Sequence, residues 1–132
     1  MVTVQVLRES RKEYWNLDCK QDSDGRTSIK LIGPGGDTWA ASGPIVWETV
    51  RTLRVQGEAR GLRLCCNGAR VDAHPSAMAI SMGGGGKVYL LKKGRKVKRR
   101  DLVDIFGSAP EDKIGTVAEQ DQFYNDWLES FR

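Results

Sequence analysis

The sequence predicts an α+β fold in which an antiparallel or mixed sheet carries two main helices. Three observations support this class. The first third of the chain alternates apolar and polar residues, with turn signals between the short runs, as antiparallel strands do. Residues 44–60 and 116–131 have the periodic apolar spacing of helices that pack on a sheet. The length of 132 residues fits a single globular domain, residues 1–132, with its own core.

The composition is that of an ordered protein, with 39% hydrophobic and 29% charged residues. Three cysteines, two of them adjacent, form no C-x-x-C pair, so we expect neither a disulfide framework nor a zinc site. The N-terminal residues lack the cationic and apolar regions of a signal peptide. No apolar run approaches the roughly 20 residues that cross a bilayer. We therefore expect a cytoplasmic protein that does not contact a membrane.

Three strands are expected to form an antiparallel meander at the N-terminus, because β-branched and apolar residues alternate with polar ones. The turn between the second and third strands is DSDGR, with Asp-Gly at its centre. The sequence GPGG ends the meander, and the short segment after it, 38–41, is either a turn or an edge strand. The three predicted strands are residues 3–7, 13–20 and 27–32.

The first helix is expected from about Pro44 to Arg60, since proline is tolerated in a first helical turn. Gly61 stands where a left-handed C-terminal cap belongs. Gly57 is expected to weaken the last turn by about 1 kcal/mol relative to alanine. Apolar side chains at the i, i+4, i+7 spacing are expected to face the core, namely Val46, Val50 and Leu53. Charged side chains of this helix are expected to face water, namely Glu48, Arg51, Arg54 and Glu58.

Two apolar runs, Leu62–Cys66 and Val88–Leu91, bracket the least regular part of the sequence. The first run is apolar at nearly every position, which predicts a central strand covered on both faces. If the two runs are neighbouring strands of one sheet, the unusual residues between them lie on one loop. These residues include the only histidine, a predicted helical turn at 76–82, and the glycines Gly83–Gly86.

The C-terminal segment contains the clearest helix. Residues 100–106 include LVDIF, which is either a strand or a short helix, and we favour a short helix or a turn. Thr116 and Glu119 are spaced as a capping box, which predicts that a helix starts there. An aromatic face is then expected to dock on the sheet, formed by Val117, Gln120, Tyr124, Trp127, Leu128 and Phe131, with Phe123 beside it.

The positive charge of the chain is concentrated in one place. The net charge is +4, and residues 92–100 (KKGRKVKRR) hold seven of the 21 basic residues, against 17 acidic residues in all. This run predicts a cationic patch that contacts nucleic acid, contacts an acidic protein, or is simply solvated. It lacks the interleaved aromatic residues with which single-strand binders stack on bases. A hairpin turn at Gly94 between two cationic strand ends is equally consistent with it.

No complete catalytic or metal-binding constellation is visible, so we expect no enzymatic activity and no cofactor. His74 lies near Ser76 and Cys66, but neighbours in an extended chain usually point apart, and a nucleophile needs its base within hydrogen-bond reach. The glycines before Lys87 do not have the Walker A spacing, although a phosphate loop remains an alternative. A flexible or tight turn into a strand explains them equally well.

Three short motifs resemble those of small uncharacterised bacterial proteins. They are CNGAR-x-D-x-x-PS-x-M, MGGG-x-x-VYLL and DLVDIF, within residues 66–106. Some of those proteins are similar to the immunity partners of polymorphic toxins. The resemblance therefore implies a protein that neutralises a cognate toxin by protein–protein contact.

The predicted function is that of a cytosolic binding protein, most simply of this immunity type, with a protein partner such as a toxin domain. The alternative is a nucleic-acid-binding module or regulator that uses residues 92–100. Trp39 and Trp47 are either anchors for a partner or rings packed over a sheet edge. The predicted partner-binding residues are Trp39, Arg70, Asp72, His74, Ser76 and Lys87, with Lys92, Lys93, Arg95, Lys96, Lys98 and Arg99 of the basic run.

Overall fold

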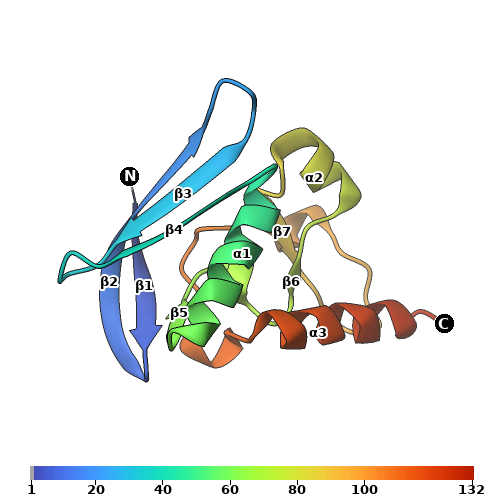
Figure 1. Ribbon diagram of the computed structural model, residues 1–132. Coiled ribbons are helices and arrows are strands. Elements are labelled where there is room, and N and C mark those ends of the chain that lie inside the picture. Colours follow the sequence, from blue (N-terminus) through green and yellow to red (C-terminus); the bar gives the residue numbers. More distant parts are fainter. Residues whose placement is uncertain (1) are drawn as a thin grey trace.

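The structure is a computed structural model that describes residues 2–132, and it has the predicted α+β architecture (Figure 1). Five antiparallel strands form a curled sheet in the order β4-β3-β2-β1-β5, and three more form a small antiparallel sheet in the order β6-β7-β8. The strands are β1 (Val2–Arg8), β2 (Arg11–Gln21), β3 (Thr27–Ile32), β4 (Thr38–Gly43), β5 (Leu62–Leu64), β6 (Ala73–His74), β7 (Lys87–Leu90) and β8 (Leu102–Asp104). The α-helices are α1 (Val46–Ala59), α2 (Ala77–Gly83) and α3 (Val117–Glu129).

The predicted N-terminal meander is confirmed, and β4 extends it as an edge strand. Leu17, Leu31 and Trp39 lie side by side in register on β2, β3 and β4, and none is more than 2% exposed. Because successive side chains alternate between the two faces of a sheet, this register places Trp39 in the core. Its indole Nε1 donates a hydrogen bond to the Leu53 carbonyl at 2.9 Å.

Helix α1 packs on this sheet, with Val50 and Leu53 fully buried as predicted. It begins at Val46, two residues after Pro44, and Gly61 beyond its end has a φ of +72°. The prediction that Arg54 faces water is wrong. Its side chain is 3% exposed and points at backbone carbonyls of the opposite segments, as described below.

The two apolar runs that bracket the irregular segment belong to different sheets, so the hypothesis that they are neighbouring strands is wrong. Strand β5 is an edge strand of the large sheet and pairs only with β1, whereas β7 is the middle strand of the small sheet. The prediction that Leu62–Cys66 is a central strand also fails. Leu62 and Leu64 are buried in the core cluster against α1, and beyond the strand Cys66 forms an isolated bridge to Ser108.

The small sheet, helix α2 and the 3₁₀ turn that leads into β8 complete the fold. The predicted helical turn is confirmed as α2, and the Ser76 hydroxyl caps it by accepting a hydrogen bond from the Ala79 N–H at 3.0 Å. At LVDIF the favoured prediction of a short helix or turn is wrong for residues 102–104, which form strand β8, the alternative, after a single 3₁₀ turn at 99–101. One core cluster includes side chains from both sheets and α1, so the sheets share their interior.

Helix α3 crosses the far side of the molecule, on the opposite side of α1 from the large sheet (Figure 1). Its predicted capping box is present: the Thr116 hydroxyl accepts from the Glu119 N–H, and the Glu119 carboxylate accepts from the Thr116 N–H. The helix contacts α1 and β6 rather than the large sheet. Trp127 is consequently half-buried instead of in the core, and Leu128 and Phe131 are exposed.

Candidate functional site

Helix α3 is held in place by a buried polar network centred on Arg54 and Gln120. The Arg54 guanidinium donates to the Gln120 Oε1 at 2.7 Å and to the carbonyls of Gly68 and Gly115 at 3.2 and 3.0 Å. The Gln120 amide donates in turn to the carbonyls of Gly68 and Arg70, at 3.0 and 2.8 Å. Burial lowers the pKa of Arg54 to about 10.

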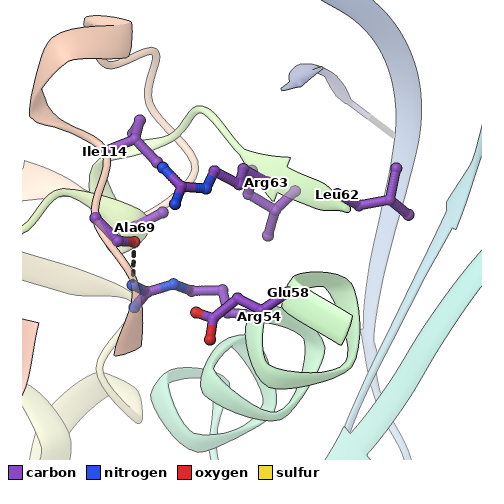
Figure 2. Close-up of a pocket in the computed structure, with 8 residues that line it drawn as sticks. Arg54, Glu58, Leu62, Arg63, Ala69 and Ile114 are labelled. Carbon is purple, nitrogen blue, oxygen red and sulfur yellow. Dashed lines mark hydrogen bonds between the residues drawn. The ribbon is translucent and has the colours of Figure 1, made fainter. Parts of the chain in front are cut away.

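Figure 2 shows Arg54 extending from α1 toward the segment that carries Ile114, with its hydrogen bond to the backbone dashed. The hollow beside it measures about 10 Å³, which is room for roughly one water molecule. This region is therefore a structural joint between α1 and α3, and too small to bind a ligand. Because of this joint, the outer side of α3 has a fixed position relative to β6 and the loops near it.

An aromatic face, made of Phe123, Tyr124, Trp127 and Phe131, follows α3 to the C-terminus. The Tyr124 and Trp127 rings stack with centroids 6.1 Å apart, and Trp127 meets Phe131 edge to face at 4.9 Å. On its other side Tyr124 stacks on His74 of β6, with centroids 3.7 Å apart and an interplanar angle of 8°. Such rings offer flat apolar surface at a low cost in conformational entropy.

The basic segment, defined as residues 92–100, lies against this aromatic face. A turn is present at Gly94, as expected, but a single isolated bridge between Lys92 and Arg95 closes it in place of two strand ends, and Gly94 has a φ of +76°. The Gly94 N–H donates to the Ser130 hydroxyl at 2.8 Å. The Trp127 Nε1–H donates to the Arg95 carbonyl at 3.0 Å, and the Lys93 ammonium lies 5.4 Å from the centre of the Phe123 ring.

A groove of about 230 Å³ opens where these parts meet. Its walls come from β6, the start of α2, β7, the basic segment and α3. The side chains that line it are almost all apolar or aromatic, and none is a carboxylate: His74, Pro75, Ser76, Ala77, Tyr89, Leu91, Val97, Tyr124 and Trp127. The arrangement is a neutral, ring-lined groove with cations at one edge, which is suited to binding rather than to acid–base chemistry.

His74 forms part of the groove wall and is held by its neighbours. Its Nδ1 lies 2.7 Å from the Pro75 carbonyl, which can only accept, so Nδ1 carries a proton. The ring is also edge to face with Trp47, at 5.6 Å. Burial lowers the pKa of His74, and the nearby Arg51 adds to this, while the Pro75 carbonyl and Asp121 oppose it. The imidazole is therefore neutral at pH 7.

Several of the predicted partner-binding residues already have partners within the protein. Arg70 and Asp72 form a two-bond ion pair, with both distances 2.8 Å, and their side chains are only 14% and 15% exposed. Ser76 is occupied as the cap of α2. Trp39, proposed as an anchor for a partner, is 1% exposed, so its ring is not available at the surface.

The remaining predicted residues are accessible. Lys87 is exposed at the start of β7, opposite Asp104 in the register of the small sheet. The basic side chains of residues 92–100 are all exposed. The structure thus brings His74, Ser76 and the basic segment to one groove, whereas Trp39 lies in the core beneath the large sheet.

Sequence reasoning missed Tyr124, Trp127 and Tyr89 as parts of a site. The signal was present in the spacing of aromatic residues along α3. That helix has more large apolar side chains than one face of a surface helix can bury, and Leu128 and Phe131 remain 41% and 42% exposed. The aromatic residues that the basic run lacks in sequence are supplied by α3, about 30 residues further along the chain.

The adjacent cysteines and the possible metal ligands show no sign of a reactive or metal-binding site. Burial raises the pKa of the Cys66 thiol to about 11, and it also raises the pKa of Cys65, which disfavours a nucleophilic thiolate at either position. Among residues 2–132, no three His, Cys, Asp or Glu side chains are grouped as metal ligands would be. In the same part of the chain, no helix has the length and apolar character needed to cross a membrane.

Comparison with known proteins adds no assignment to this geometry. No protein-family model matches the chain, and no curated protein is significantly similar to it. The immunity-type role therefore stays a prediction, and the features of this chain that bear on function are the groove, the basic segment and the aromatic face.

Proposed function

We propose that this protein binds nucleic acid through the basic segment. The observation that carries the proposal is a set of exposed, unpaired cations held against an aromatic helix face. Of the seven cations, only Lys93 makes an ion pair, with Asp126 at 3.9 Å. Within residues 2–132 the other six have no carboxylate partner, namely Lys92, Arg95, Lys96, Lys98, Arg99 and Arg100.

Unpaired cations on a fixed backbone are what a phosphate chain requires. Each phosphate that a lysine or arginine neutralises releases a condensed counterion, and this release drives binding. The hydrogen bonds of Gly94 and Arg95 to α3 fix the start of the segment, so less conformational entropy is lost when a strand binds. The cations at 95–100 follow one another closely in the sequence and are all exposed, so several can reach one phosphate chain.

The test is the salt dependence of binding to a single-stranded oligonucleotide. The slope of log K against log salt is about −0.7 for each phosphate contact on a single strand. Replacing Lys96, Lys98, Arg99 and Arg100 by Gln is expected to flatten that slope by about 3 and to weaken binding strongly at low salt.

A matched control removes the same charge elsewhere. Arg11, Lys20, Arg26 and Lys30 are exposed on the strands and turns of the large sheet. Their replacement by Gln is expected to leave the slope within about one unit of the original, because they lie outside the proposed contact. If both variants flatten the slope equally, binding depends on the total charge of the protein and not on the basic segment. If the wild-type protein binds no oligonucleotide at low salt, the nucleic-acid function is rejected.

A second candidate is the immunity-type protein that neutralises a bacterial toxin by direct contact. Its support is an exposed apolar pair on α2: Met78 and Met82 are 71% and 82% exposed and lie four residues apart, on one side of the helix. Flexible methionine side chains are common on surfaces that bind proteins. Met78 lies next to the groove, because its neighbour Ala77, in the first turn of α2, is one of the residues that line the groove.

The second candidate is tested by co-expressing the chain with the product of the adjacent gene. A tight one-to-one complex that protects the cell would support it, and Met78→Asp with Met82→Asp should abolish both effects. The control is Val55→Asp on α1, where the side chain is 55% exposed and lies outside both α2 and the lining of the groove. A chain that neither binds nor protects would remove this candidate.

A further inference from the structure

We propose that the groove between β7, α3 and the basic segment receives one unpaired base of a single-stranded nucleic acid, stacked against Trp127. This inference depends on the proposed nucleic-acid function and specifies it: the cations bind phosphates, and the groove selects strands with free bases over duplexes.

The size and lining of the groove fit a planar ring. At about 230 Å³ it is smaller than the roughly 300–1,000 Å³ pockets that hold drug-sized ligands, so it accommodates a ring system rather than a whole nucleotide. Tyr89, Tyr124 and Trp127 supply aromatic surface, and Val97 closes the side toward the basic segment. Every base has a flat π-face, so stacking on such rings needs no particular sequence.

The Trp127 ring is already oriented for this role. Its Nε1–H is fixed on the Arg95 carbonyl at 3.0 Å, and Phe131 meets it edge to face. Tyr124, which also lines the groove, has one face covered by His74. A base that enters therefore meets rings whose rotamers are fixed before binding, which lowers the entropy lost on association.

The charges around the groove favour a nucleic acid over an acidic peptide. Lys96 and Lys98 flank Val97 in sequence and are exposed, so the cations lie at the rim while the groove itself is neutral. A nucleotide matches this arrangement, with an apolar ring inside and a phosphate on either side. An acidic side chain would bring its carboxylate to the rim and leave the aromatic surface uncovered.

A base already stacked in a duplex cannot enter. The flanking base pairs cover both of its faces, and extrusion would cost a few kcal/mol. Duplex DNA is therefore expected to bind through phosphates alone and more weakly than a single strand of equal charge.

The test compares two strands that differ only in their bases. One is an oligothymidine of about ten nucleotides, within the range that single-strand-binding modules cover, and the other is an abasic strand of equal length and charge. The full-length protein is expected to bind the oligothymidine about 10-fold more tightly, which is the contribution of one stacked base. Trp127→Leu should abolish this preference, and any loss of affinity for the abasic strand that follows from the lost hydrogen bond to the Arg95 carbonyl should be shared by Trp127→Phe, which loses the same bond.

Two further variants separate stacking from structural damage. Trp127→Phe keeps an aromatic ring and loses the hydrogen bond to Arg95, so most of the preference should remain. Tyr14→Ala removes an exposed ring, 62% accessible, from the distant large sheet, so it should change nothing. A preference that Trp127→Phe and Trp127→Leu lose equally would overturn the stacking role.

Fluorescence gives an independent readout. The chain has four tryptophans, and Trp15, Trp39 and Trp47 are no more than 6% exposed. Quenching by oligothymidine should therefore come from Trp127 and disappear in Trp127→Phe. Equal binding of thymidine and abasic strands would overturn the groove inference but leave the phosphate function standing. No binding of either strand at low salt, or tighter binding of polyglutamate, would reject both.

Discussion

At the scale of single residues, Gln120 matters most for the position of the site. It is completely buried, it accepts from the only buried arginine in residues 2–132, and it donates to two backbone carbonyls. The sequence pattern correctly predicted Gln120 on the packed face of α3, but it wrongly predicted that Arg54 of α1 faces water. A charge in an amphipathic pattern usually marks the solvated side, and nothing in the pattern shows the loop carbonyls that Arg54 meets.

Replacing Gln120 by Leu should lower the free energy of unfolding by about 2–4 kcal/mol. The substitution leaves the buried Arg54 guanidinium with fewer acceptors and the Arg70 carbonyl without this donor. Urea unfolding measures the change. Gln122→Leu, on the exposed side of the same helix, is the control and should cost no more than about 0.5 kcal/mol. Equal costs would contradict the structural role of the network.

His74 gives the stability a defined pH dependence. Because burial lowers its pKa in the folded state, the unfolded chain takes up a proton at a higher pH than the native protein does. The contribution of the neutral ring is thus fully present above about pH 6.5 and declines as the pH falls toward the lower folded-state pKa. His74 is the only histidine, so a single variant isolates the effect.

The expected result is that unfolding free energy falls more between pH 7.5 and about pH 5 in the wild type than in His74→Phe. Phenylalanine preserves stacking on Tyr124 but does not titrate in this range. Urea denaturation at both pH values measures the two differences. The same pH dependence in the wild type and the variant would contradict a lowered pKa of His74 in the folded protein.

At the scale of elements, strands with regular alternation were predictable and the small sheet was not. The meander follows from local pattern, because buried apolar residues alternate with polar ones within each strand, as Val4 and Val6, Trp15 and Leu17, and Ile29 and Leu31 show. Strand β8 has three residues, too few for a periodic signal to separate it from a turn. The apolar run at Cys65 and Cys66 suggested a central strand, but it has a strand, β1, on one side only, and on the other it meets Ser108 and Ala109 of a loop.

Helix α1 yields a prediction opposite to the one from helix propensity. Alanine at position 57 would stabilise an isolated helix by about 1 kcal/mol. In the folded protein its methyl group would lie 2.3 Å from the Trp39 ring and 2.9 Å from the Leu62 carbonyl. Gly57→Ala is therefore expected to destabilise the protein by about 1–3 kcal/mol, measured as a lower urea midpoint.

The control for this prediction is Gly35→Ala in the turn between β3 and β4. An added methyl group meets no atom within 4 Å there, and the backbone lies outside the left-handed region. The stability should stay the same or rise slightly. A more stable Gly57→Ala protein would mean that Trp39 can move aside, and that the contact between α1 and β4 is looser than described.

At the scale of the whole molecule, the site arises from segments that are far apart in the chain. The basic segment was visible in the sequence, as was the aromatic periodicity of α3, but their contact was not. It depends on the Arg54–Gln120 network that orients α3 and on the hydrogen bonds of Gly94 and Arg95 to the end of that helix. The absence of aromatic residues within the basic run counted against single-strand binding, and the fold provides them from elsewhere.

The most direct test is to locate a bound strand by photocrosslinking. An oligonucleotide carrying 4-thiothymidine is crosslinked to the full-length protein at low salt, and the attached peptides are identified by mass spectrometry. We expect the crosslinks at residues 92–100 and 123–131, because the basic segment binds the phosphates and the aromatic face meets the bases. Crosslinks confined to the large sheet, residues 2–43, would contradict this account.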